Sequence, residues 1–346
     1  MLLFNKNKPY PEKDYPIMQQ PSLEPNEYQL EQIHRKFGMF IHFGINTFNN
    51  QEWSNGKLPV KSYKPTAIDA DGWIKTAYEA GMNYVILITK HHDGFCLWDT
   101  HTTEYSVNYS PNKTDVVAEV AKACKKYGVK LGLYYSLWDR HEKCYRNSEK
   151  YVCYMESHLK ELLGGKYGEI VELWLDGCWD KPCRKWQLDR LYNLVKTLQP
   201  KCQFGINHTI GEFSEKKSAP DERYKPENYQ YGDPIRMFPS DFRLWDPHMC
   251  REDDPKIYTF NNKKYYLPFE MTICSRGNKD MSWFYSDTYE SKPLQDVDMV
   301  VENYKILEKT GNIMVINMPP NCDGKLVRGD VENLMRISKR LGLNRV

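Results

Sequence analysis

Short apolar runs alternate with amphipathic stretches along most of this chain, and this alternation is the feature that most constrains the fold. A strand buried on both faces reads as a continuous apolar run, and strands that alternate with helices pair in parallel through right-handed crossovers. The pattern therefore predicts an α/β fold around a parallel sheet. The runs are FGMFIHFG (37–44), YVILITKHH (84–92), VKLGLYYS (129–136), IVELWLDG (170–177), CQFGIN (202–207), YLPFEMTI (266–273) and NIMVINM (312–318).

Helices are expected between several of these runs, and glycines mark where three of them end. Seven or eight strand–helix units can be counted, and the uncertain unit falls in the long polar stretch near 212–265. The sequence therefore predicts a single-domain (β/α)8 TIM-like barrel, and a distorted barrel fits the pattern as well as a perfect one. The expected helices are 28–37, 70–80 before Gly81, 115–127 before Gly128, 150–163 before Gly164, and 330–341.

The domain organisation follows from the same pattern. Residues 1–30 are rich in Pro, Glu and Gln and lack periodicity, so we expect an extended wrap there. Residues 31–346 form the expected catalytic barrel, with the polar insertion near 212–265. An open doubly wound sheet is the alternative, but the chain has neither a Gly-x-Gly-x-x-Gly turn after the first strand nor a Gly-Lys-Ser/Thr phosphate loop.

Charge and hydropathy restrict the binding partners and the cellular location that can be expected for this protein. The chain has 48 Lys and Arg against 46 Asp and Glu, so a net charge of +2 gives no reason to expect nucleic acid or an anionic membrane as a partner. No run is long enough to span a bilayer, and the first residues lack the apolar core of a secretory signal. We therefore expect a cytoplasmic protein, or a periplasmic or secreted one if a signal has been removed. The oligomeric state is not encoded in any feature of the sequence.

Polar residues cluster where the expected strands end, which is where α/β barrels carry their active sites. Asp176 ends the buried-looking run VELWLD, so its carboxylate needs hydrogen bonds or a cation if it is to stay ionised. The simpler alternative for Asp176 is a helix cap. The other candidates at or just after strand ends are His42, Glu52, Trp53, His91, His92 and Tyr135.

The adjacent pair His91 and His92 restricts the chemistry. Side chains alternate along a strand, so the two rings cannot both point into the barrel, or share a metal, unless the backbone bends there. Neutral imidazoles that bind different hydroxyls of a sugar fit better, although a buried structural histidine is the simpler alternative for each. Trp53 and Trp283 could supply flat faces for a sugar, or belong to the core. No metal or other cofactor is expected, because His-x-His and His-Glu-x-x-His spacings are absent.

Several segments together resemble a known family, the α-L-fucosidases of glycoside hydrolase family 29. They are KFGMFIHFG, QEW, AGMNYVILITKHHDGFCLWDTHTTEYSV, KLGLYYS and ELWLDG, and the resemblance extends over residues 30–330. It implies an exo-acting, retaining enzyme that releases L-fucose from fucosylated oligosaccharides or glycoconjugates. It also implies that Asp176 attacks the anomeric carbon to form a fucosyl-enzyme ester, which water then hydrolyses. The pocket residues that it implies are His42, Glu52, Trp53, His91, His92 and Tyr135.

The acid/base partner is less well defined. Many family members have a Glu in a segment resembling Asp-Phe-Lys/Arg-Thr-x-Glu, whereas this chain reads PSDFRLWDPH and places Asp246 there. Asp246 could protonate the leaving oxygen, or only initiate a turn before Pro247. Glu270, in an apolar run, is the main rival as acid or as support for the site, and Glu222 and Glu227 are further candidates. A retaining mechanism requires the two carboxyl groups to lie about 5 to 5.5 Å apart.

Family members commonly carry a β-sandwich after the barrel, and this chain ends in a helix, so the resemblance covers the barrel domain alone. Three hypotheses follow. The chain is an active fucosidase, a fucose-binding barrel with impaired catalysis, or a metal-dependent barrel hydrolase that uses its His cluster. The linkage that is cleaved and the preferred aglycone stay open.

Overall fold

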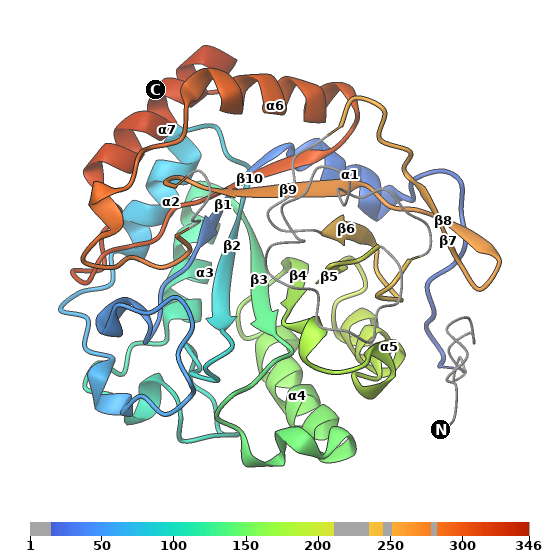
Figure 1. The fold of residues 1–346 in the computed structure, drawn as a ribbon, viewed down its shortest axis with the longest axis horizontal. Helices are drawn as coiled ribbons and strands as arrows, with labels where there is room; N and C mark the ends of the chain where they lie inside the picture. The colour runs from blue at the N-terminus through green and yellow to red at the C-terminus, as the bar shows by residue number, and fades with distance from the viewer. Residues whose placement is uncertain (1–14, 211–234, 245–250, 278–281, 346) are drawn as a thin grey trace, which may run out of the picture.

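The computed structural model describes residues 15–210, 235–244, 251–277 and 282–345. Eight parallel strands close into a barrel in the order β1-β10-β9-β6-β5-β4-β3-β2, so the predicted TIM-like barrel is confirmed (Figure 1). The barrel strands are β1 (Phe37–Ile41), β2 (Tyr84–Lys90), β3 (Lys130–Ser136), β4 (Ile170–Asp176), β5 (Gln203–Asn207), β6 (Phe242–Leu244), β9 (Phe269–Cys274) and β10 (Ile313–Asn317).

The helices pack around the outside of the barrel (Figure 1). Most begin at a side chain that accepts a hydrogen bond from the first turn, such as Asp115 before α3, and α3 ends at Gly128 in the left-handed conformation. The first helix ends at Arg35 rather than at the expected residue 37, because Phe37 already pairs in β1. The helices are α1 (Glu27–Arg35), α2 (Ala70–Glu79), α3 (Val116–Tyr127), α4 (Ser148–Leu163), α5 (Leu188–Leu198), α6 (Val297–Lys309) and α7 (Arg328–Leu341).

The barrel departs from regularity on the side of β6, a strand of only three residues. Phe242 in β6 pairs with Gly205 in β5, and its ring occupies the space that a side chain at Gly205 would need. A hairpin of β7 (Ile257–Phe260) and β8 (Lys263–Tyr266) is inserted between β6 and β9. This hairpin and β6 both lie within the predicted polar insertion, whose residues 211–234 and 245–250 are outside the described segments.

The described part of the predicted N-terminal wrap, residues 15–26, has no helix or strand. The backbone N–H of Ile17 donates to Asn193 Oδ1 on α5, and that of Ser22 donates to the carbonyl of Lys264 on β8. Helix α1 begins at Glu27, inside the predicted segment 1–30. Among the described helices, none is long and apolar enough to cross a membrane.

Candidate active site

Asp176 is the last residue of β4 and lies at the carboxyl end of the barrel. Tyr134 on β3 donates its hydroxyl to Asp176 Oδ2 at 2.8 Å, and Asn207 on β5 donates its side-chain amide to Oδ1 at 3.0 Å. The side chain of Asp176 is 10% exposed. Neither carboxylate oxygen caps the 3-10 helix that follows, because the residue at the cap position is Gly177. Two neutral donors therefore support and orient a carboxylate that remains accessible from the barrel mouth.

A bend at the end of β2 brings both His91 and His92 into the site. The pairing of β2 with β3 is regular up to Ile88 opposite Tyr134, then shifts so that Lys90 lies opposite Tyr135. This irregularity breaks the strict alternation of side chains. As a result the two imidazoles are both buried, with ring centroids 4.1 Å apart.

Hydrogen bonding fixes the tautomer of His92. Its Nδ1 lies 2.7 Å from Ser136 Oγ, and the Ser136 hydroxyl donates its own proton to the carbonyl of Trp138. His92 Nδ1 must therefore carry the proton that Ser136 accepts. The other ring nitrogen, Nε2, lies 3.6 Å from Asp176 Oδ2, too far for a hydrogen bond. Burial lowers the pKa of His92 well below its usual value, so Nε2 is a neutral acceptor beside the carboxylate.

His42, directly after β1, has the same arrangement. Its Nδ1 donates to Asn317 Oδ1 at 2.7 Å, and burial lowers the pKa of His42 to about 3. Burial also lowers the pKa of His91, whose Nδ1 lies 3.5 Å from Asn46 Nδ2. The three histidines are thus neutral, which suits hydroxyl groups of a sugar better than an anionic ligand.

Glu52 connects the loop after β1 to the segment after β9. Its Oε2 accepts the backbone N–H groups of Trp283 at 3.1 Å and Phe284 at 3.2 Å. Burial raises the pKa of Glu52 to about 7, although these hydrogen bonds and Lys292 oppose the shift. The Trp283 ring lies 5.0 Å from the His42 ring, so Trp283 and His42, both predicted site residues, belong to the same cluster.

Three indoles form an aromatic wall beside His92. Trp53, 42% exposed, lies edge-on to His92 at 5.1 Å and to Trp138 at 5.7 Å, and stacks on Trp179 at 6.1 Å. An exposed indole held by two others presents a fixed flat surface for the apolar face of a sugar. Trp53 therefore lies at the site as predicted, together with Trp138 and Trp179, which the sequence analysis did not single out.

Tyr135 does not line this cluster, and its neighbour Tyr134 does. The Tyr135 hydroxyl bonds to His158 Nδ1 on α4 at 2.9 Å, on the outer side of the barrel. Tyr134 stacks on Trp174 inside the barrel and reaches Asp176. Alternation along β3 explains the difference, because adjacent residues point to opposite faces.

Glu270 lies at the other end of the barrel, which corrects its prediction as the acid. It is the second residue of β9 and accepts the Tyr84 hydroxyl at 2.7 Å. Burial, followed by the charge of the nearby Glu172, which pairs with Arg35 at 3.0 Å, raises the pKa of Glu270. Glu172 lies four positions before Asp176 on β4, a rise of about 13 Å. Glu270 is therefore well beyond the separation that a retaining pair needs.

The remaining acid candidates cannot be placed, since Asp246, Glu222 and Glu227 lie outside the described residues. Within the described segments, no three His, Cys, Asp or Glu side chains are arranged to hold a metal ion. The functional residues that the sequence analysis left off its site are Tyr134, Trp138, Trp179, Asn207 and Asn317. Tyr134 could have been found by counting alternate residues from Ser136, which pairs with Asp176 across β3 and β4.

Comparison with known proteins places the chain in a family. The sequence matches the family described as Alpha-L-fucosidase over residues 57–345. It is 34% identical to "Alpha-L-fucosidase 1" of Arabidopsis thaliana over 96% of this chain and 62% of that protein, and 30% identical to "Putative alpha-L-fucosidase 1" of Oryza sativa subsp. japonica over 94% and 59%. The chain thus spans about three-fifths of the length of these plant relatives.

Solved structures show the same barrel. A glycoside hydrolase 29 family member from an unknown rumen bacterium superposes with a TM-score of 0.76 at 26% identity, over 92% of this chain and 57% of that one. An α-L-fucosidase from Bacteroides thetaiotaomicron, trapped as a covalent intermediate with 2-fluoro-fucosyl fluoride, shares the fold with a TM-score of 0.71 at 20% identity, over 94% and 76%. With the family matched over most of its length, this chain belongs to the α-L-fucosidases of glycoside hydrolase family 29.

Proposed function

We propose that this protein is a retaining exo-α-L-fucosidase whose nucleophile is Asp176. The observation that carries the proposal is the setting of that carboxylate, which is held by Tyr134 and Asn207 and lies 3.6 Å from the neutral Nε2 of His92. A covalent intermediate has been trapped in another member of the family, so a carboxylate that can attack a sugar is the expected central group.

In the first step Asp176 attacks the anomeric carbon of fucose and forms an ester, while the bond from that carbon to the leaving oxygen breaks. The leaving oxygen takes a proton from the acid. In the second step the same group, now a carboxylate, removes a proton from water, and the water oxygen displaces Asp176 and restores the configuration. Net hydrolysis therefore needs no other reactant.

The neutral histidines and Glu52 would bind the hydroxyl groups of the sugar. His42 Nδ1 donates to Asn317, which leaves its Nε2 as an acceptor, as in His92. Hydrogen bonds that strengthen as the ring flattens towards the transition state increase kcat as well as affinity. The exposed Trp53 ring is suited to pack against the apolar face or methyl group of fucose.

We propose Asp246 as the acid/base group. It follows Leu244, the last residue of β6, by two positions in the sequence, and the loops after barrel strands carry the catalytic residues of this fold. Exclusion of Glu270, which lies at the opposite end of the barrel, removes the rival that competed for this role. The pKa of Asp246 would have to rise from a reference of about 3.9 towards the working pH for Asp246 to act as an acid.

The test is hydrolysis of 4-nitrophenyl α-L-fucoside by the wild type and by Asp176→Ala and Asp246→Ala, each with and without azide. We expect Asp176→Ala to lose activity by at least about 10³-fold. Azide should rescue Asp246→Ala and give a fucosyl azide of retained configuration. Wild-type activity in Asp246→Ala would place the acid elsewhere, and an inert wild type on this and natural fucosides would favour a fucose-binding barrel without catalysis.

A further inference from the structure

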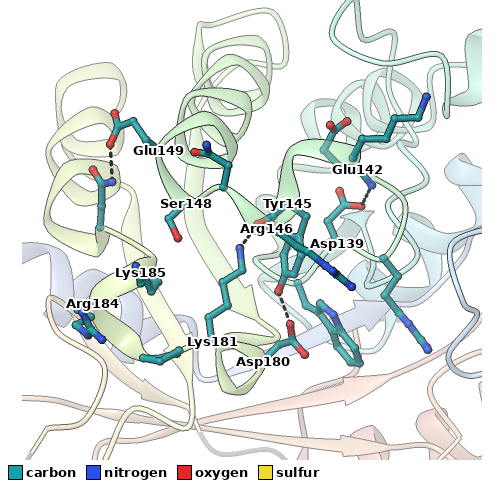
Figure 2. A pocket seen from close by; sticks show the side chains of 16 residues that line it. Asp139, Glu142, Tyr145, Arg146, Ser148, Glu149, Asp180, Lys181, Arg184 and Lys185 are labelled. Atoms are coloured by element: carbon teal, nitrogen blue, oxygen red, sulfur yellow. Dashed lines mark hydrogen bonds between the residues drawn. The ribbon is translucent and has the colours of Figure 1, made fainter. Parts of the chain in front are cut away.

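A groove of about 1070 Å³ opens between the loops that follow β3 and β4 (Figure 2). One side runs from Trp138 through the 3-10 helix Lys143–Arg146 into the first turn of α4. The other side runs from Asp180 to Gln187. Both loops follow the carboxyl ends of barrel strands, so the groove lies on the same face of the barrel as Asp176.

Trp138 separates the groove from the cluster around Asp176. It lines the groove, and its ring lies 5.2 Å from the ring of His92 and 5.7 Å from that of Trp53. The backbone N–H of Leu137, one residue earlier, donates to the carbonyl of Asp176 at 2.7 Å. A glycan with its fucose at Asp176 therefore has the groove next to it, where the rest of the glycan can lie.

The groove carries an excess of positive charge. Asp139 is neutralised from behind by Lys90, whereas Glu149 shares Arg190 with Glu156. Neither Lys90 nor Arg190 lines the groove. Six basic and four acidic residues line it, a surplus of two positive charges that the pairing of Asp139 with Lys90 raises to about three, on a chain whose net charge is only +2. The basic residues are Arg140, Lys143, Arg146, Lys181, Arg184 and Lys185, and the acidic ones are Asp139, Glu142, Glu149 and Asp180.

Four of these cations form neither an ion pair nor a side-chain hydrogen bond with any residue that the structure describes. They are Lys143, Arg146, Arg184 and Lys185, all exposed, and they come from both sides of the groove. In Figure 2 Arg184 and Lys185 lie on one side of Lys181, and Arg146 lies on the other. Charges of one sign that converge on a concave surface raise the local concentration of ligands of the opposite sign.

Lys181 is fixed in place within the groove. Its ammonium lies 3.5 Å from the ring centre of Tyr145 and 4.8 Å from that of Trp186, and it donates to the Tyr145 carbonyl. Burial lowers the pKa of Lys181 to about 8, so it remains mostly protonated at neutral pH. A cation that is already immobilised loses little conformational entropy when it binds an anion.

We propose that this groove binds an anionic group, a carboxylate or a sulfate ester, on the part of a fucosylated glycan that lies beyond the fucose. The inference rests on the proposed fucosidase activity and names the class of substrate that the same site would prefer. A neutral glycan would gain binding affinity from the aromatic wall alone, whereas an anionic glycan would also gain affinity from the cations on both sides of the groove.

The test compares fucosides of one linkage that differ only in the sugar next to fucose: neutral galactose, galacturonic acid and galactose sulfate. The ratio of kcat/KM for each anionic substrate to that for the neutral one is measured at about 0.01 M and about 1 M salt, where the screening length falls from about 30 Å to about 3 Å. The variant Lys143→Gln/Lys185→Gln removes one cation from each side of the groove. Lys305→Gln/Lys309→Gln, two exposed lysines on α6, makes the same change of charge elsewhere.

We expect the wild type to favour at least one anionic substrate by about fivefold or more at low salt and to lose that preference at high salt. The groove variant should lose most of the ratio, and the α6 variant should keep it. The two anionic substrates distinguish a carboxylate site from a sulfate site. Equal kcat/KM for all three substrates, or a ratio that the groove variant leaves intact, would overturn the proposal.

Failure of the proposed catalysis would look different, because 4-nitrophenyl α-L-fucoside would then also be stable. In that case calorimetric titration of the same three glycans into Asp176→Asn decides the matter directly. Tighter binding of an anionic glycan, weakened in the groove variant, supports the site. Equal binding of the neutral and anionic glycans refutes it.

Discussion

The substitution Glu270→Gln tests whether Glu270 lies at the end of the barrel opposite Asp176. The direction of its effect on the free energy of unfolding follows from the pKa of Glu270. Burial, followed by the nearby Glu172, raises the pKa of Glu270 well above its reference of 4.5. We therefore expect the carboxyl group to keep its proton at neutral pH and to share it with Glu172, while the oxygen Oε2 accepts from Tyr84. A Gln amide supplies one donor and one acceptor in the same positions without binding a proton.

The magnitude follows from proton linkage. Above about pH 4.5 the unfolded chain releases a proton that the folded protein keeps, so this group makes the free energy of unfolding fall by about 1.4 kcal/mol per pH unit until Glu270 itself titrates. Glu270→Gln removes that slope. If the proton is kept throughout, the variant gains about 4 kcal/mol relative to the wild type between about pH 5 and about pH 8.

The assay is urea unfolding of both proteins at several pH values, together with kcat/KM on 4-nitrophenyl α-L-fucoside. Stability contributions of the groups that do not interact with Glu270 cancel in the difference between the two proteins. We expect kcat/KM to stay within about threefold, since an acid/base residue would contribute about 10² to 10⁴. A difference in stability that does not grow with pH would refute the shared proton, and a collapse of activity would refute the position of Glu270.

Three further changes probe the site and its support. Tyr134→Phe removes a donor that orients the nucleophile and should lower kcat/KM about tenfold or more. Tyr135→Phe, the same change on the outer face, should lower the thermal midpoint and leave kcat/KM within about twofold; the reverse order would contradict the orientation of β3. Burial raises the pKa of Glu52 to about 7, so its ionised form is lost as pH falls through 7 and KM should rise there. Glu52→Gln should flatten the dependence of KM on pH, and an unchanged dependence would exclude Glu52 as its source. Lys90→Met leaves Asp139 buried without its cation and should lower the free energy of unfolding, measured in denaturant titrations, by about 3 to 5 kcal/mol. The double variant Lys90→Met/Asp139→Leu should partly restore it. No loss in the single variant would mean that the ion pair contributes nothing to stability.

Most of the barrel could be predicted from the sequence because its strands are buried on both faces and read as apolar runs. The exception is β6, in which Arg243 occupies the middle position. Arg243 is buried because Asp254, eleven residues further on, pairs with it. A contact of that kind is set by the folded chain, and no periodicity in the sequence reports it.

The candidate site could be predicted in part, because parallel strands bring their carboxyl ends to one edge of the barrel. The structure brings His91, His92 and Asp176 together as that rule requires. Tyr135 was misplaced by one residue, since an apolar run does not show which of two adjacent tyrosines faces inward. Glu270 was misplaced along its strand, because a run without polar alternation does not show where pairing begins.

The central claim is that Asp176 becomes covalently attached to fucose, and trapping of that ester tests it most directly. The wild-type protein is incubated with 2-fluoro-fucosyl fluoride, digested with a protease and analysed by mass spectrometry. We expect one fluorofucosyl group per chain, on the peptide that contains Asp176, and none in Asp176→Ala. A group attached to another residue, or hydrolysis of the reagent without any adduct and with inversion of configuration, would contradict the account.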